Sequence, residues 1–430
     1  MSPEDPPEDP FALFQNAFGN IFPGKGLSGI GTPGVSQPGS DPARQIAMAI
    51  ASEGSSEPNV DPIVRMEYES LVRVAELQVA NRTGLTVARS GTLSVRPVNR
   101  TVWASSSVDA YRPYLSKMAQ LPSDLTEGLD LGIDGQRLDT GDPHGEQTLN
   151  WLSGLMSAMA PMMAGMTTGT MVGRLALRSL GTYDLPIPRP TGGPDADTLL
   201  IVAPNIEEFG TSWSLPPEDL RLWICLHEVA HHAVLGVPHI RDTIGNLLAQ
   251  HAGAFRNDPS DLGGRLGLDF EGLDLGGEGL DSMAGADALA RLQGALDPEA
   301  VLGAVRSSEQ EELLPLLEAL VAVVVGVVDY VMDVVGNGLI RSYDQVTEAV
   351  RRRRVTTTDA DRFVERILGL NLTQEQVDRG ASFVVGVVER AGEDGLSLLW
   401  EGAQSLPTPS EVDAPGLWLA RLEFQDPLTN

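Results

Sequence analysis

The sequence predicts a mainly helical chain with a few short strands. Apolar residues recur at helical spacing over long segments, at 43–77, 307–336 and 373–391. Two short runs have the character of strands: 92–98 alternates apolar with polar side chains, and 197–206 is a compact aliphatic run that ends in Pro and Asn. No repeat of fixed period is evident. We therefore expect helices to form the core and strands to be minor elements.

The chain is predicted to hold one folded domain, at 42–430, after an N-terminal tail. Residues 1–41 are acidic and rich in Pro and Gly, a composition typical of disorder. A Gly/Asp-rich stretch at about 257–285 lacks the ligand spacing of a calcium-binding loop, so we interpret it as an exposed insertion.

A Met-rich segment at 147–173 carries no charge over 27 residues, long enough to span a membrane. Met, Ala, Gly, Ser and Thr dominate it, however, and Pro161 interrupts it. Gly165, Gly169 and Gly173 would form a flat ridge where another helix packs closely. We predict a buried core helix, broken near Pro161, and no membrane span.

Two helices have clear start signals. The segment 214–235 begins with Ser214, which can cap the helix, and two prolines fit its first turn. The segment 307–336 begins with a capping box formed by Ser308 and Glu311.

The chain has a formal net charge of −29 and a pI near 4.4. This acidity argues against nucleic acid or an anionic membrane as partner, because both are bound by clustered Lys and Arg. The run of four arginines at 351–354 is short, and we interpret it as a solvated helix end or turn. Cys225 is the single cysteine, which fits a reducing compartment, and the N-terminus lacks a secretory signal. These features predict a cytoplasmic protein.

The stretch HEVAH predicts a metal site. On a helix, His227 and His231 lie about 40° apart in projection, so both imidazoles can reach one ion. Glu228 is turned about 100° from His227, close enough to poise a water on that ion. Two neutral imidazoles hold Zn²⁺ and leave positions open, while the ion lowers the pKa of its water to roughly 7. The opposite interpretation, that the histidines merely belong to a polar helix, stays open. We interpret His232 and Cys225 as structural.

A third ligand has to come from elsewhere in the chain. The metzincin pattern would place Gly and His at positions 234 and 237, but both are Val. His239 in the following loop is a candidate. Asp329 is another, because a charge within the apolar run VAVVVGVVDYVMDVVG needs a reason. The competing interpretation is that Asp329 faces water on an amphipathic helix.

These motifs resemble a zincin-like hydrolase family of actinobacteria, of the thermolysin-like H-E-x-x-H type, which is associated with biosynthesis of the deazaflavin coenzyme. The resemblance covers most of 42–425. It is carried by YDLPIP, IVAPNI, HEVAHHAVLGVPHIRD, GVVDYVMD and the long block that begins ILGLNLTQEQVDRG. It implies a zincin-like metalloprotease fold, a zinc cofactor, His227 and His231 as ligands, and Glu228 as the general base.

The resemblance also implies where a third ligand would stand. Members carry a Glu-Gly pair in the later helix, with an aspartate four residues after the glutamate. Here Gly326 and Asp329 match, but the glutamate's position is Val325, which cannot bind a metal. Asp329 would then orient a ligating histidine or bind the metal itself. Glu318 lies on nearly the same helix face as Val325, about 10 Å away along the axis, so the candidates for third ligand are Asp329, Glu318 and His239.

Two functions follow from these residues. The first is a metallohydrolase, a zinc-dependent peptidase or amide hydrolase that uses metal-activated water on a peptide or small amide substrate. The second is a catalytically inactive zincin-fold binding or scaffold protein, with weak or absent zinc. The intact Glu228 favours the first, and Val325 favours the second. The sequence gives no indication of the oligomeric state.

Overall fold

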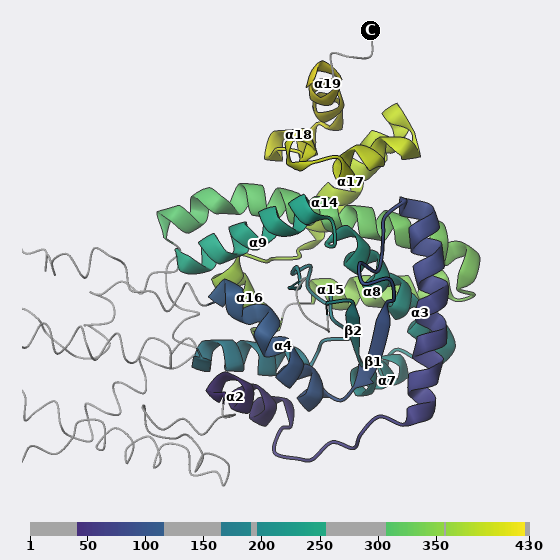
Figure 1. Cartoon of the computed structure of the whole chain (residues 1–430), viewed down its shortest axis with the longest axis vertical. Helices are drawn as coiled ribbons and strands as arrows, with labels where there is room; N and C mark the ends of the chain where they lie inside the picture. The colour runs from purple at the N-terminus through teal and green to yellow at the C-terminus, as the bar shows by residue number, and fades with distance from the viewer. Residues whose placement is uncertain (1–40, 116–164, 191–195, 255–306, 357, 426–430) are drawn as a thin grey trace, which may run out of the picture.

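The computed structural model describes residues 41–115, 165–190, 196–254, 307–356 and 358–425 (Figure 1). Helices dominate this part of the chain, and its strands are two short ones, so the predicted mainly helical fold is confirmed. The predicted tail, the Gly/Asp-rich insertion and the first part of the Met-rich segment lie outside the described residues.

The first two helices each start with an aspartate followed by a proline. Asp41 caps α2 (Pro42–Ala51) by accepting a hydrogen bond from the second helical residue. Asp61 caps α3 (Pro62–Thr83) in the same way. Proline fits the first turn because its missing N–H would have no partner there. Gly84, with a φ of 68°, ends α3, which forms an outer edge of the molecule (Figure 1).

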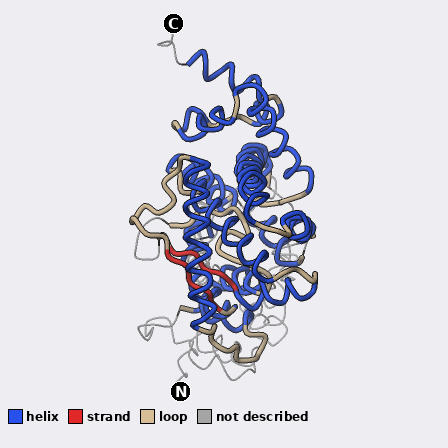
Figure 2. The backbone as a smooth tube through the Cα atoms, turned by 90° about the vertical axis from the view of Figure 1, so that its right-hand side faces the viewer, coloured by secondary structure: helices blue, strands red, loops and turns tan. Residues whose placement is uncertain are grey.

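The strands form a small parallel sheet. The elements concerned are β1 (Ser94–Val98), α4 (Arg100–Leu115), β2 (Thr198–Val202) and α7 (Ala203–Ser212). Ser94 lies opposite Thr198, and the pairing continues in register to the other end of both strands. Figure 2 shows the sheet along one side of the helical body. The predicted strand within 197–206, stopped by Pro204 and Asn205, is present as β2. Pro204 stands in the first turn of α7, where proline is tolerated and a strand would lose a hydrogen bond.

A helix at residues 165–176 packs against α2 through its glycines. A Cβ on Gly169 would lie 2.6 Å from the carbonyl oxygen of Ala43, and one on Gly173 would lie 3.0 Å from that of Ala47. The two backbones touch because these positions carry no side chain. The predicted close helix packing on this ridge is therefore confirmed.

α8 (Pro217–Val234) carries the HEVAH stretch and is followed by α9 (Pro238–Gly253). It lies in the interior, in contact with α3 and with two helices described below (Figure 1). The predicted cap Ser214 is wrong: this residue has a φ of 52°, and the N-cap position is Pro216, which makes no side-chain hydrogen bond. The residue before a proline is held in an extended conformation, so the helix starts at the second proline.

α14 (Ser308–Leu339) is the longest helix in the described part of the chain. Its N-cap is Ser307, whose hydroxyl accepts from the Gln310 N–H while the Gln310 side chain accepts from the Ser307 N–H. The predicted capping box at Ser308 and Glu311 is therefore one residue too late.

α14 is also the core helix. Its most apolar window, with a mean hydropathy of 2.1, would suit a membrane span, but 83% of that window is buried inside the protein. It crosses α17 (Gln374–Ala391) where Gly326 and Gly380 meet. A Cβ on Gly380 would lie 1.9 Å from the carbonyl oxygen of Ala322, so this crossing requires glycine.

Short helices complete the chain. They are α15 (Tyr343–Val355), α16 (Asp359–Leu368), the 3-10 helices η2 (Glu393–Trp400) and η3 (Ala403–Ser405), α18 (Pro409–Asp413) and α19 (Pro415–Gln425). α17, α18 and α19 lie together at one end of the molecule (Figures 1 and 2). There Trp418 is fully buried and donates to the carbonyl of Ser405. α14 and α15 pack against α8, as do α3 and α7.

Candidate metal and hydrolase site

α8 brings His227 and His231 together on its buried surface. Their ring centroids lie 4.3 Å apart. The ring of Trp223 stacks on His227 at 5.1 Å, and the ring of Tyr183 stacks on His231 at 6.1 Å. The side chain of His227 is 12% exposed, whereas His231 is buried. Aromatic neighbours thus fix both imidazoles.

Both imidazoles are neutral near pH 7. Burial lowers the pKa of His227 to about 4, and the positive charge of Arg354 contributes to the shift. Burial and the neighbouring His227 hold the pKa of His231 well below its ordinary value. His231 Nδ1 lies 3.2 Å from the His227 carbonyl oxygen, which can only accept, so Nδ1 carries the proton and Nε2 keeps its lone pair. A metal binds imidazole in this neutral form.

Backbone N–H groups fix the carboxylate of Glu228. It accepts from the N–H of Thr182 at 2.7 Å and from that of Tyr183 at 3.0 Å. Gly181 permits this approach, since a Cβ there would lie 2.4 Å from the carboxyl carbon. Thr182 Oγ1 in turn accepts from the N–H of Leu200 in β2 at 2.7 Å. The small sheet therefore positions the loop that holds Glu228.

Glu228 is 1% exposed. Burial raises its pKa to about 8, although the two backbone N–H groups favour the charged form. A carboxyl group with such a pKa exchanges its proton near neutral pH, where general acid–base groups work best.

A chain of buried polar side chains supports the same loop. The Tyr183 hydroxyl lies 3.0 Å from Nδ1 of His232, and His232 Nε2 lies 3.2 Å from Asp197 Oδ1. Because the carboxylate accepts, His232 donates from Nε2 and accepts from Tyr183 at Nδ1. The predicted structural role of His232 is confirmed. Tyr183 and Asp197 were missed, because nothing near them in sequence marks them as its partners.

Of the three predicted candidates for third ligand, Asp329 lies near the histidines. Its negative charge raises the pKa of both, against the net shift. His239 lies at a different place and donates Nε2–H to the carbonyl of Leu399 at 2.8 Å. Glu318 is half-buried on α14 and does not border the recess that contains His227. Among the described residues, no three His, Cys, Asp or Glu side chains gather closely enough to hold a metal ion.

Asp329 is engaged by Arg354 of α15. Each carboxylate oxygen accepts a hydrogen bond from the guanidinium at 2.9 Å, and both side chains are 11% exposed. Burial works to raise the pKa of Asp329, but the charge and hydrogen bonds of Arg354 outweigh it, and the pKa lies below its ordinary value. The interpretation that Asp329 faces water is therefore wrong.

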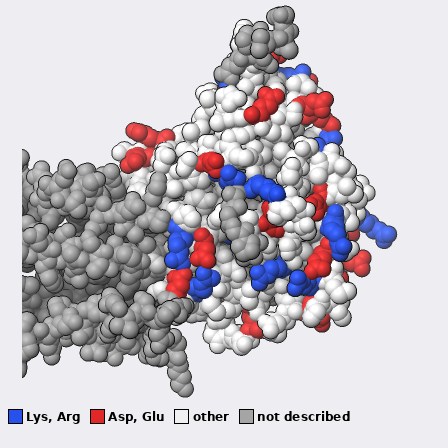
Figure 3. Space-filling model, viewed as in Figure 1, with Lys and Arg blue, Asp and Glu red and all other residues white. Residues whose placement is uncertain are grey.

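The arginine run at 351–354 is partly buried. Arg351 and Arg352 are 42% and 65% exposed, as expected of a solvated helix end. Arg353 and Arg354 are 17% and 11% exposed and pair with aspartates of other elements, so the prediction is wrong for these two. Elsewhere, acidic and basic side chains alternate on the face shown in Figure 3.

His227 and Glu228 border a recess that is partly open to solvent. Helices α8, α15 and α16 line it, together with the segments 178–185 and 370–372. Arg353 pairs across it with Asp184 at 3.0 Å. The predicted base and one predicted metal ligand therefore border the same recess.

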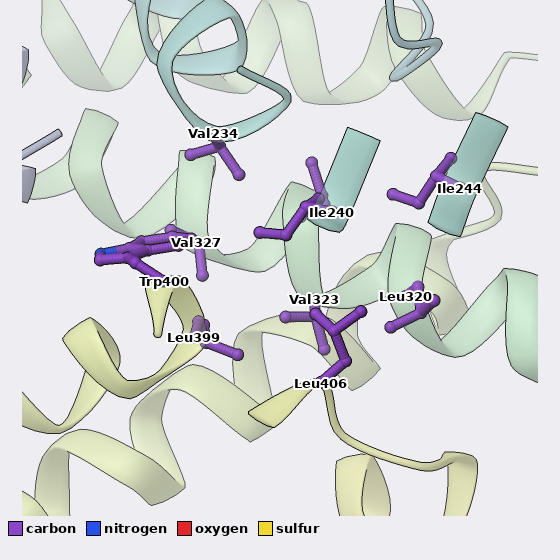
Figure 4. A pocket seen from close by; sticks show the side chains of 10 residues that line it. Val234, Ile240, Ile244, Leu320, Val323, Val327, Leu399, Trp400 and Leu406 are labelled. Atoms are coloured by element: carbon purple, nitrogen blue, oxygen red, sulfur yellow. The ribbon is translucent and has the colours of Figure 1, made fainter. Parts of the chain in front are cut away.

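A second, smaller recess, also partly open, is lined by apolar side chains. Figure 4 shows Val234, Ile240 and Ile244 facing Val323 and Val327 of α14, with side chains of η2 below them. Its lining offers no group that can carry a proton or bind a metal. The chemistry of the described residues is concentrated in the first recess.

Comparison with known proteins assigns the chain. The family model described as zincin-like metallopeptidase matches residues 40–419. The chain belongs to this family. The expected zincin-like family is thereby confirmed over most of the chain. A crystal structure of a "putative hydrolase with a novel fold" from Chloroflexus aurantiacus is 22% identical, with a TM-score of 0.56. The match covers 89% of this chain and 97% of that one, and shows a shared fold. Among curated proteins, none matches.

Proposed function

We propose that this protein is a zinc-dependent hydrolase of peptide or other amide bonds. His227 and His231 would hold the ion, and Glu228 would accept the proton of the attacking water. One observation carries the proposal: Glu228 is a buried carboxyl group with a pKa near 8, held by two backbone N–H groups at the wall of the recess that His227 also borders. A buried, perturbed ionisable group in a cleft is typical of functional sites.

The donor set suits zinc in type. Hydrolytic zinc sites commonly combine two histidines with one carboxylate. His227, His231 and Asp329 are side chains of these types, although the three do not gather into a metal site while Arg354 holds Asp329. Both imidazoles are neutral, and His231 keeps Nε2 unprotonated. Because Arg354 holds Asp329, the two histidines are the part of the site that is already assembled.

A bound zinc ion would supply a Lewis acid that acidifies water and polarises a carbonyl group. The chain's own residues do the rest. Glu228 takes a proton from the attacking water and passes it to the nitrogen of the leaving amine. Burial keeps this carboxylate basic, and the N–H groups of Thr182 and Tyr183 hold it in place, so little reorganisation is needed during the reaction.

The recess supports a peptide or small amide as substrate. It is partly open to solvent and presents both polar and apolar side chains. Apolar side chains such as Leu180 and Leu372 alternate in its wall with polar ones such as Asn371. Such a wall can accommodate a side chain and hydrogen-bond an amide group.

The alternative is an inactive binding protein. It is favoured by Val325, which stands where a glutamate ligand is expected, and by the ion pair that Asp329 forms with Arg354. Membership of the zincin-like metallopeptidase family supports the hydrolase instead. The two functions differ in what a metal analysis finds.

The test is elemental analysis of protein purified without chelator or His tag, compared with His227→Ala. His239→Ala is the matched control, because this histidine bonds to a backbone carbonyl away from the site. About one zinc per chain, lost in His227→Ala and kept in His239→Ala, is expected. A screen of peptide and amide substrates then follows, with Glu228→Gln as the blank. No metal in the wild type after zinc is offered, together with no hydrolysis, would leave the binding protein as the function.

A further inference from the structure

Asp329 and Arg354 form a buried ion pair beside the two histidines. Oδ1 and Oδ2 of Asp329 each accept from a different nitrogen of the guanidinium, both at 2.9 Å. This bidentate, charge-assisted contact is the strongest arrangement that a carboxylate and a guanidinium can form. A metal ion that takes Asp329 as ligand has to open this contact or compete with it.

Arg354 also brings its positive charge close to the proposed metal site. Its side chain and that of His227 line the same recess, and the guanidinium is held there by both oxygens of Asp329. Because like charges repel, a cation bound at His227 would be disfavoured by a guanidinium in the same recess.

Arg354 lies at the inner face of α15. It stands near the end of α15, in the arginine run, and its side chain is almost completely buried. Its neighbour Arg352 points outward and pairs with Glu348 in the same helix. One arginine of the run thus reaches the site while another stays on the surface.

We propose that Arg354 is a latch on Asp329 that sets the metal affinity of the site. While the ion pair is closed, Asp329 is withheld from the metal and a positive charge faces the histidines. When it opens, Asp329 becomes the third ligand. Arg354 acts as a positioning residue, and the proposal rests on the proposed function, since it requires a metal at His227 and His231.

Zinc affinity tests the latch directly. It is measured on the full chain by competition with a chromophoric zinc chelator, for the wild type and for Arg354→Met, which removes the charge and the donors but keeps an apolar stem. The Kd for zinc is expected to fall by about 10- to 100-fold, the range over which neighbours of metal ligands change affinity. Arg352→Met is the matched control and should leave the Kd unchanged.

Two further variants keep the test decisive if the unpaired Asp329 prevents Arg354→Met from folding. Arg354→Lys keeps the charge but cannot hold both oxygens, so the Kd for zinc should fall by a smaller factor. The double variant Arg354→Met with Asp329→Asn removes the buried charge and the ligand together. It should bind zinc about tenfold or more weakly than Arg354→Met.

The outcomes separate the latch from the proposed function. Unchanged or weaker zinc binding in both Arg354 variants overturns the latch, whereas loss of zinc in His227→Ala still supports the metal site. Equal affinity in the double variant and in Arg354→Met shows that Asp329 is no ligand, and also overturns the latch. If neither the wild type nor any variant binds zinc, both proposals are refuted.

Discussion

Glu228→Gln measures how the ionisable carboxyl group at this buried position changes the free energy of unfolding with pH. Glutamine has nearly the same shape, and its oxygen can still accept from the N–H groups of Thr182 and Tyr183. It cannot ionise, however. The variant therefore removes the titration of this one side chain and leaves the loop that holds it in place.

The magnitude follows from the pKa of Glu228. An exposed glutamate has a pKa of 4.5, and burial raises that of Glu228 to about 8. Between pH 4.5 and 8, the folded protein therefore keeps the proton on Glu228, whereas the unfolded chain releases it. Stability from this group is fully present below pH 4.5 and is lost as pH rises through 8. At about 1.4 kcal/mol per pH unit, the wild type should lose about 5 kcal/mol across this window.

The assay is urea unfolding at pH 4.5, 6, 7, 8 and 9, followed by tryptophan fluorescence. A chelator is present throughout, because a bound cation would lower the pKa of the nearby carboxyl group. His227 and His231 titrate alike in both proteins, so the difference in free energy of unfolding isolates Glu228. That difference should shift in favour of Glu228→Gln by up to about 5 kcal/mol between pH 4.5 and 9.

Glu348→Gln is the control, because Glu348 is 56% exposed and pairs with Arg352 on the surface. Its difference from the wild type should stay within about 0.5 kcal/mol at every pH. If the Glu228→Gln difference is equally flat, or favours the wild type at high pH, then Glu228 is not held protonated by burial.

Three other substitutions test the structure around the site. Gly181→Ala places a Cβ 2.4 Å from the carboxyl carbon of Glu228, so thermal denaturation should show the free energy of unfolding reduced by about 1–3 kcal/mol. Any hydrolytic activity should fall with it, and no change in either quantity would contradict this contact. Gly380→Ala places a Cβ 1.9 Å from an α14 carbonyl oxygen and should lower the free energy of unfolding by about 3 kcal/mol or more in the same assay. The control is Gly338→Ala on α14, whose Cβ would meet nothing within 4 Å and which should not destabilise. Equal effects of the two variants would refute the close crossing. His227→Gln removes a group whose pKa is lowered from 6.5 to about 4, so the wild type should lose about 3 kcal/mol relative to this variant as pH falls from 6.5 to 4; parallel urea-unfolding curves over that range would contradict it.

The sequence was sufficient where structure depends on local pattern. Helices at 307–336 and 373–391 were predicted from periodicity, and both are present with small shifts of their ends. The start of α14 shows why the ends were harder. Ser307 with Gln310 and Ser308 with Glu311 fit a capping box equally well, but the Ser307 hydroxyl also donates to the carbonyl of Ala254. A contact from a distant segment decided between them.

The same distinction applies to the site. His227, Glu228 and His231 lie within five residues on one helix, so their proximity could be predicted from spacing alone. The groups that determine their chemistry come from elsewhere. Thr182 and Tyr183, which hold the carboxylate, precede Glu228 by 46 and 45 residues. No local pattern in the sequence links these positions to Glu228.

The buried arginines could have been predicted by one further step. α14 ends at Leu339 and α15 begins at Tyr343, and so short a connection makes the two helices antiparallel neighbours. Residues later in α14 must then face residues earlier in α15. Asp329 indeed pairs with Arg354, and Asp333, one turn later, pairs with Arg351. The aspartates of the apolar helix and the arginine run are therefore the two sides of one helix contact. The ion pair at the proposed metal site is the inner end of this contact.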